Sequence, residues 1–134
     1  NNIISSSSGT TFNNVTLNNG GVDFSTNSTI NNNLTINSGG FVDTNSPIYG
    51  DNSTLIYNSA NPTGTPYERR SEWSNAGSQG SPNNVVLQNN TALNMGFDNT
   101  TVNAVIDGNL TIEAGRGSQS IEDCSASFGL VSRS

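Results

Sequence analysis

The sequence predicts an all-β fold, a parallel β-helix (β-solenoid) of about six coils, and three observations lead to this prediction. Short runs alternate between apolar and polar residues, as at residues 15–17 and 110–112, which is the periodicity of half-buried strands. These runs recur along the chain. Asparagines flank them repeatedly and glycines often follow, so equivalent positions repeat in kind.

The composition fits a narrow column better than a compact globule or a disordered tract. Hydrophobic residues make up 31% of the 134 residues, which is too few for a thick two-layer core. Only 10% of residues are charged, whereas disordered chains of low hydrophobicity usually carry many more charges. The length suits a single domain whose coils expose most of their side chains.

The first coils are expected on either side of corners made of asparagine and glycine. Residues 1–11 form a serine-rich lead-in that would add a partial strand to the first full coil. That coil has strands at residues 15–17 and 22–24, and the Asn-Asn-Gly-Gly corner between them suits positive φ. The next coil covers about residues 28–46. Its predicted inward-facing residues are Ile30, Leu34, Ile36, Phe41 and Val42.

The pattern breaks between residues 59 and 82. This stretch contains three of the four prolines and no alternating run, so it is predicted to be a long loop insertion that leaves the solenoid. Alternation resumes at residue 83 and continues to residue 112. The predicted organisation is therefore a solenoid domain over residues 1–114, followed by a C-terminal cap or irregular tail at 115–134.

The stacking of like residues distinguishes a solenoid from a β-sandwich, which also has short strands and turns. In a column with coils about 4.8 Å apart, asparagines at equivalent positions would form a hydrogen-bonded asparagine ladder. Thr16, Thr35 and Thr111 would likewise form an outward row suited to ordering water or ice. Threonine is, however, common in strands for its β-propensity alone.

Charge and residue types exclude several classes of function. The net charge is −6, lysine and histidine are absent, and arginine supplies all four positive charges. Binding to nucleic acid or to an anionic membrane needs clustered cations, so neither partner is predicted. No apolar run approaches the length of about 18 residues that membrane insertion needs. Because the chain has no histidine and Cys124 is its only cysteine, His–Cys zinc sites and imidazole catalysis are excluded within this chain.

The chemically densest stretch is residues 67–73 of the predicted loop, where four charged residues lie directly before the only tryptophan. Aromatic faces beside carboxylates and guanidinium groups suit a sugar-binding surface. The alternative is structural, with the aromatic residues pinning the loop to the solenoid and an arginine pairing with a glutamate. The candidate glycan-binding residues are Tyr67, Glu68, Arg69, Arg70, Glu72 and Trp73.

Aspartates near the predicted corners form a weaker candidate site. Glycoside hydrolysis needs two carboxyl groups roughly 5–10 Å apart, and two stacked acids could also hold Ca²⁺. Asp23 and Asp43 could stack on one face of neighbouring coils, whereas Asp51, Asp98 and Asp107 are scattered. None lies in a recognised motif, and aspartate is an ordinary turn residue. No catalytic residue, metal ligand or cofactor is therefore assigned, although Ca²⁺ stays an open alternative.

One part of the chain resembles a known family. The elements that carry the likeness are Tyr57, the Arg-x-x-Glu-Trp of residues 69–73, the Pro-Asn-Asn-Val of residues 82–85 and the Gly-Asn-Leu-Thr-Ile of residues 108–112. They resemble the Asn/Thr-rich β-helical repeats of large secreted surface proteins in the Bacteroidetes, and the likeness ends at Gly117. The resemblance implies export to the cell surface and a spacer or adhesin-like role, with no catalytic residues to carry over.

Two functions are compatible with these observations. The first is a non-enzymatic extracellular module of a larger secreted surface protein, with glycans, other surface proteins or further solenoid coils, end to end or side by side, as partners. The second is a carbohydrate-active β-helix, a lyase or hydrolase with Arg69 or Arg70 and a carboxylate in a groove. A groove lined by two carboxylates and an arginine would favour the enzyme. A smooth column with Trp73 packed flat would favour the module.

Overall fold

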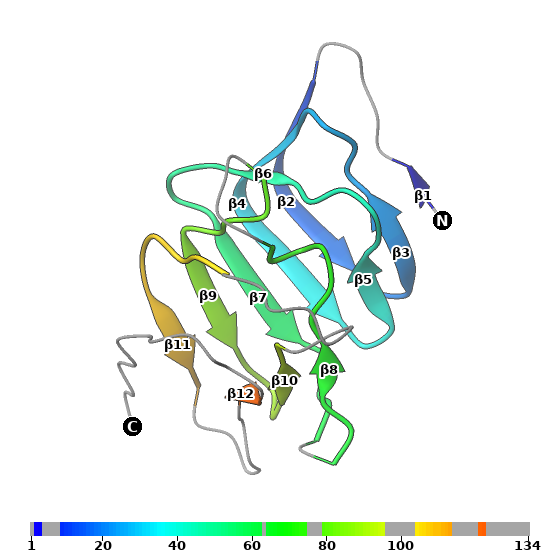
Figure 1. Cartoon of the computed structure of the whole chain (residues 1–134), viewed down its shortest axis with the longest axis vertical. Coiled ribbons are helices and arrows are strands. Elements are labelled where there is room, and N and C mark those ends of the chain that lie inside the picture. Colours follow the sequence, from blue (N-terminus) through cyan, green and yellow to red (C-terminus); the bar gives the residue numbers. More distant parts are fainter. Residues whose placement is uncertain are drawn as a thin grey trace.

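The structure is a computed structural model that describes residues 2–3, 9–62, 64–74, 79–95, 104–113 and 121–122, excepting the side chains of 2–3 and 121–122. Its regular elements in these ranges are all β-strands, and all the strand pairs are parallel. The strands stack as a β-solenoid, which confirms the predicted fold class (Figure 1). In the ranges that the structure describes, the solenoid has about four turns, and not the six or so that the sequence predicted.

The largest sheet runs through every turn of the solenoid and forms one broad face (Figure 1). Its neighbours are in the order β11-β9-β7-β4-β2, and β6 pairs with the first part of β4. The strands are β2 (Thr10–Leu17), β4 (Ser28–Asn37), β6 (Ile48–Tyr49), β7 (Thr54–Asn58), β9 (Asn84–Leu87) and β11 (Leu110–Ile112).

Two small sheets complete the coils. One has the order β1-β3-β5, and the other has the order β12-β10-β8. Their strands are β1 (Asn2–Ile3), β3 (Gly20–Asp23), β5 (Gly40–Val42), β8 (Tyr67–Glu68), β10 (Leu93–Asn94) and β12 (Ile121–Glu122). The chain thus passes from the large sheet around a corner to a short strand and back, which is how a solenoid closes each turn.

The core is a single file of aliphatic side chains from the large sheet. In-register pairing stacks one residue from each coil in the order Val15, Leu34, Leu55, Val85 and Leu110. The three middle members are fully buried, whereas Val15 at the end is only half-buried. Spacing along this file grows from 19 residues in the first interval to 30 in the third, which explains why the chain completes fewer turns than predicted.

An asparagine ladder runs along the end of the large sheet, as the sequence predicts. The Asn58 side-chain amide donates to Asn37 Oδ1 at 2.7 Å, and the Asn37 amide donates to Asn18 Oδ1 at the same distance. Side chains of like length meet because the strands are in register. The predicted threonine row is interrupted, since Ile56 and Val86 stand between Thr35 and Thr111 in the register.

The Gly-Gly corners adopt positive φ, as the sequence predicted. Gly20 and Gly39 have φ of +84° and +82°, a conformation that favours glycine. The corners of successive coils also stack, because the Gly20 N–H donates to the Gly39 carbonyl at 2.8 Å. At Gly40 a Cβ atom would overlap the backbone of Leu17, so close approach requires glycine there.

Two sequence predictions, one about a strand and one about a side chain, need correction. Residues 59–82 do not lack a strand, because β8 lies within them and pairs with β10. Phe41 does not face inward, since its neighbours Gly40 and Val42 are buried and Phe41 itself is partly exposed. Alternation along a strand allows only one of two adjacent residues to face the core.

The predicted boundaries at the two ends fall mostly outside the described residues. Of the serine-rich lead-in, the structure describes β1, which pairs with β3, and residues 9–11. Of the predicted cap or tail at 115–134, it describes only β12, which continues the β8–β10 sheet in parallel. Asp98 and Cys124 also lie outside the described residues.

Candidate functional site

The segment that follows β8 turns inward, so most of the predicted sugar-binding cluster is buried. Trp73 is 0% exposed, and its indole Nε1–H donates to the Val105 carbonyl at 3.1 Å. Arg69 is 5% exposed, and its guanidinium donates to three main-chain carbonyls, those of Arg70, Trp73 and Met95. An arginine used in this way fixes backbone and has few donors left for a ligand.

Glu72 is the acidic centre of this buried cluster. Its Oε1 accepts hydrogen bonds from the Tyr57 hydroxyl at 3.1 Å and from the Arg70 backbone N–H at 2.9 Å. Its carbonyl oxygen accepts from the Tyr49 hydroxyl at 2.6 Å. Among the described residues, Glu72 Oε2 and the Tyr67 hydroxyl are buried without a partner at hydrogen-bonding distance and angle.

Burial dominates the ionisation of this cluster. Loss of hydration raises the pKa of Glu72, and the hydrogen bonds from Arg70 and Tyr57 and the charge of Arg69 only partly oppose it. Burial also raises the pKa values of Tyr49, Tyr57 and Tyr67, and the nearby Glu72 adds to each shift. The three tyrosine hydroxyls therefore stay neutral, and those of Tyr49 and Tyr57 donate hydrogen bonds to Glu72.

Of the six predicted residues, the structure leaves only part at the surface. Trp73 and Glu72 have no exposed area and cannot touch a glycan, and Arg69 is committed to carbonyls. The burial of Trp73 matches the structural alternative, in which an aromatic residue pins the segment to the column. The hydrogen bonds of Arg69 go to main-chain carbonyls and not to the glutamate partner of that alternative. Glu68 and Arg70 are half-exposed, and Tyr67 is 9% exposed.

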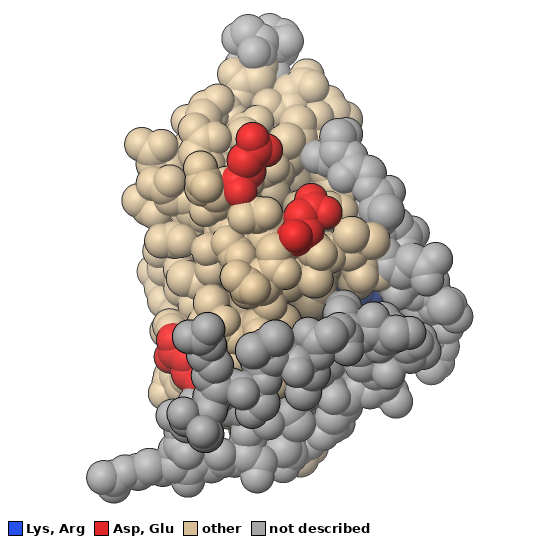
Figure 2. All heavy atoms as spheres, turned by 90° about the vertical axis from the view of Figure 1, so that its left-hand side faces the viewer, with Lys and Arg blue, Asp and Glu red and all other residues tan. Residues whose placement is uncertain are grey.

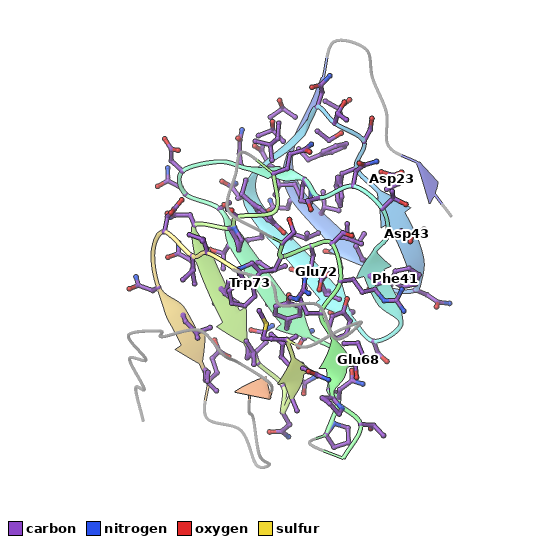
Figure 3. All side chains as sticks on the ribbon, in the orientation of Figure 1. Asp23, Phe41, Asp43, Glu68, Glu72 and Trp73 are labelled. Carbon is purple, nitrogen blue, oxygen red and sulfur yellow. The ribbon has the colours of Figure 1, made fainter. Side chains whose placement is uncertain are left out.

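A shallow groove lies where these surface residues meet the corner of the preceding coil. Its volume is about 260 Å³. Figure 3 shows Phe41 and Glu68 at the margin of the molecule, whereas Glu72 and Trp73 lie nearer its middle. The lining residues are Ser38, Gly39, Gly40, Phe41, Asn61, Pro66, Tyr67, Glu68 and Arg70.

Arg70 is held in this groove by an aromatic side chain. Its guanidinium carbon lies 4.3 Å from the centre of the Phe41 ring, a cation–π arrangement. The Phe41 ring also packs against Gly21, where an added Cβ would overlap the ring. Glycine at position 21 therefore makes room for Phe41, and Phe41 in turn orients Arg70.

The two aspartates of the predicted pair lie at corners of neighbouring coils, where Asp23 stabilises a turn. Asp23 and Asp43 follow directly after the paired residues Val22 and Val42, and Figure 3 shows them on the same side of the column. Asp23 Oδ1 accepts from the Ser25 backbone N–H and from the Asn45 amide, both at 2.8 Å. The Ser25 bond, and then that from Asn45, lowers the pKa of Asp23.

No acidic cluster of the kind that holds a metal occurs among the described residues. These residues contain no group of three His, Cys, Asp or Glu side chains placed to hold a metal ion. Figure 2 shows one face of the molecule, on which the acidic side chains stand singly among neutral residues. Within the described ranges, Glu68 is the only carboxylate that lines the groove.

Sequence reasoning found half of the groove and missed the other half. Tyr67, Glu68 and Arg70 were identified by their residue types, but the opposite wall from residues 38–41 was not. The usable signal was strand alternation, which places Phe41 outward once Val42 faces the core. Pairing of β3 with β5 then sets Phe41 opposite Gly21.

Comparison with protein-family models, curated protein sequences and solved structures found no significant match for this chain. The likeness to Bacteroidetes surface repeats thus stays a prediction. A search of the described residues for a helix long and apolar enough to cross a membrane found none.

Proposed function

We propose that this chain is a non-enzymatic structural and adhesive module of a larger secreted surface protein. The observation that carries the proposal is the burial of the one dense cluster of charged and aromatic residues. The column buries the side chains of Trp73, Glu72 and Arg69, which pack and form hydrogen bonds inside it. The groups best suited to chemistry are therefore used to hold the fold together. Among the described residues, those that are exposed are mainly asparagine and threonine.

The groove supports the same proposal. Glycoside hydrolysis uses two carboxyl groups on either side of the scissile bond. Among the described lining residues Glu68 supplies one carboxylate and Arg70 one cation. Opposite charges in one groove can bind a polar ligand, and the described lining residues supply no second acid for hydrolysis.

The end of the column formed by β2 suits association with another coil. Phe12 and Val15 are only partly buried, whereas the residues paired with them in β4, Ile30 and Leu34, are fully buried. A further parallel strand would cover Phe12 and Val15 as β4 is covered by its neighbours. End-to-end stacking of coils is the partner geometry that accompanies the proposed module.

A glycan panel tests the proposal. Neutral and acidic polysaccharides are incubated with the protein, with and without Ca²⁺, and both retention on immobilised glycan and release of reducing or unsaturated ends are measured. A module retains some glycans and releases no ends under either condition. Release above that of a Glu68→Gln variant would instead establish the alternative, a polysaccharide lyase or hydrolase whose groove uses Glu68 and Arg70.

A further inference from the structure

The groove beside β8 has the size of a site for one small unit. Its volume of about 260 Å³ lies below the roughly 300–1,000 Å³ of pockets for drug-sized ligands. It is formed by two coils, with Ser38 and the Gly39–Gly40 backbone on one wall and Pro66 and Glu68 on the other. A site of this size admits a single ring of a longer polar chain.

The wall of the groove formed by Gly39 and Gly40 is low because packing inside the column requires glycine at both positions. Gly40 is needed because a Cβ would overlap Leu17, and Gly39 is needed because its φ is positive. Neither residue has a side chain to fill the groove. The space is therefore built into the corner and does not depend on the rotamer of a long side chain.

The polar groups of the groove are balanced in charge. Arg70 contributes donors and Glu68 contributes acceptors, while Ser38 adds a hydroxyl that can do both. Planar carboxylate and guanidinium groups can each engage two neighbouring hydroxyls. Pro66 and the edge of Tyr67 supply apolar surface for C–H groups.

The guanidinium of Arg70 is oriented before any ligand arrives. It lies on Phe41, and Phe41 packs against Gly21. Pre-orientation lowers the conformational entropy lost when a side chain engages a ligand. Lysine would keep the charge at this position but not the planar fork.

We propose that this groove, lined by Ser38, Pro66, Glu68 and Arg70, binds one neutral hexopyranose unit of a glycan. The inference rests on the adhesive function proposed above and names its ligand class. A neutral sugar is favoured over a uronic acid because the attraction of Arg70 for a carboxylate is offset by the repulsion from Glu68, and the chain carries a net charge of −6. Vicinal hydroxyls match both the acceptors and the donors of the groove.

The experiment uses the isotope-labelled whole chain and simple sugars. Methyl pyranosides of glucose, galactose and mannose are titrated while backbone amide shifts are recorded, with glucuronate as the acidic counterpart. At least one neutral sugar is expected to shift the amides of Gly39, Gly40 and Arg70 with a Kd on the order of 1 mM, as for other small ligands in shallow sites. Glucuronate is expected to bind more weakly.

Matched variants separate the groove from the rest of the surface. Glu68→Gln removes one charged acceptor and should weaken binding about tenfold. Ser38→Trp should fill the groove and abolish binding. As controls, Glu113→Gln makes the same replacement as Glu68→Gln, and Thr16→Trp introduces the same side chain as Ser38→Trp. Both lie at exposed positions outside the groove and should leave binding unchanged. Circular dichroism confirms that each variant is folded.

The possible outcomes are distinguishable. Shifts confined to the groove, with a Kd about tenfold higher in Glu68→Gln, support the site. No shift at concentrations about tenfold above the expected Kd, an unchanged Kd in Glu68→Gln, or tighter binding of glucuronate would overturn it. Absence of sugar binding without release of glycan ends leaves the structural module standing, whereas release of ends overturns the module itself.

Discussion

Two valine-to-alanine substitutions in the same stacked file test the single-file core directly. Val85 is fully buried between Leu55 and Leu110 in the register, whereas Val15 ends the file and contacts the column mainly through Leu34. Each substitution removes the same two methyl groups. The difference between them therefore reports position in the column and not chemistry.

The expected magnitudes follow from burial. Removing two buried methyl groups loses about 1.6 kcal/mol of transfer free energy. A cavity of roughly 40 Å³ at Val85 adds about 1 kcal/mol, because in-register neighbours above and below limit collapse. Val85→Ala should thus lower the free energy of unfolding by about 2.5 kcal/mol. Val15→Ala should lower it by about 0.8 kcal/mol, since that side chain is half-exposed and leaves no closed cavity.

The free energy of unfolding is measured by urea titration. Unfolding is monitored both by far-ultraviolet circular dichroism and by the fluorescence of the buried Trp73. Coincident curves from the two probes justify a two-state treatment, which repeat proteins do not always satisfy. Equal losses for the two substitutions, or a larger loss for Val15→Ala, would refute the single-file core and the stacking from which it was inferred.

The remaining predictions concern the buried acid, the ladder and a corner. Because burial raises the pKa of Glu72, its contribution to stability is full below the unfolded pKa near 4.5 and is lost as pH rises through the folded value. The urea midpoint of the unsubstituted protein should therefore fall as pH rises above 4.5, and it should fall less in Glu72→Gln. Parallel plots of urea midpoint against pH for the two proteins would contradict this. Asn37→Ala should cost about 1–2 kcal/mol, because that amide both donates and accepts in the ladder, and an unchanged urea midpoint would count against the ladder. Gly40→Ala should cost about 3 kcal/mol through overlap with the Leu17 backbone, against about 1 kcal/mol for Gly20→Ala, where only the positive φ opposes a side chain, and thermal unfolding would rank the two.

Much of the fold could be predicted because local patterns determine it. Alternation identified the strands, and the repeated asparagines gave the register that the Asn18–Asn37–Asn58 ladder confirms. Coil length could not be obtained in the same way. The interval from Leu55 to Val85 is 30 residues because it contains β8 and the buried Trp73 segment, and nothing local distinguishes such a segment from a loop.

The candidate site could be predicted only in part, for a related reason. Residue types drew attention to the stretch around Glu72 and Trp73, yet burial of an acid depends on distant partners such as Tyr49 and Tyr57. Those partners come from other positions of the coil, so no local pattern reveals them. Phe41 was missed for a different reason, since strand alternation alone would have placed it outside.

The asparagine ladder also gives the column a direction. Each recorded link donates from the later coil to the earlier one, so Asn18 uses its oxygen and Asn58 uses its amide hydrogens. In this row Asn18 accepts and does not donate, whereas the Asn58 end lies inside the column because β9 pairs with β7. A further coil placed on the Asn18 side would continue the row by offering an acceptor, so an asparagine there would meet Asn18 through its side-chain oxygen.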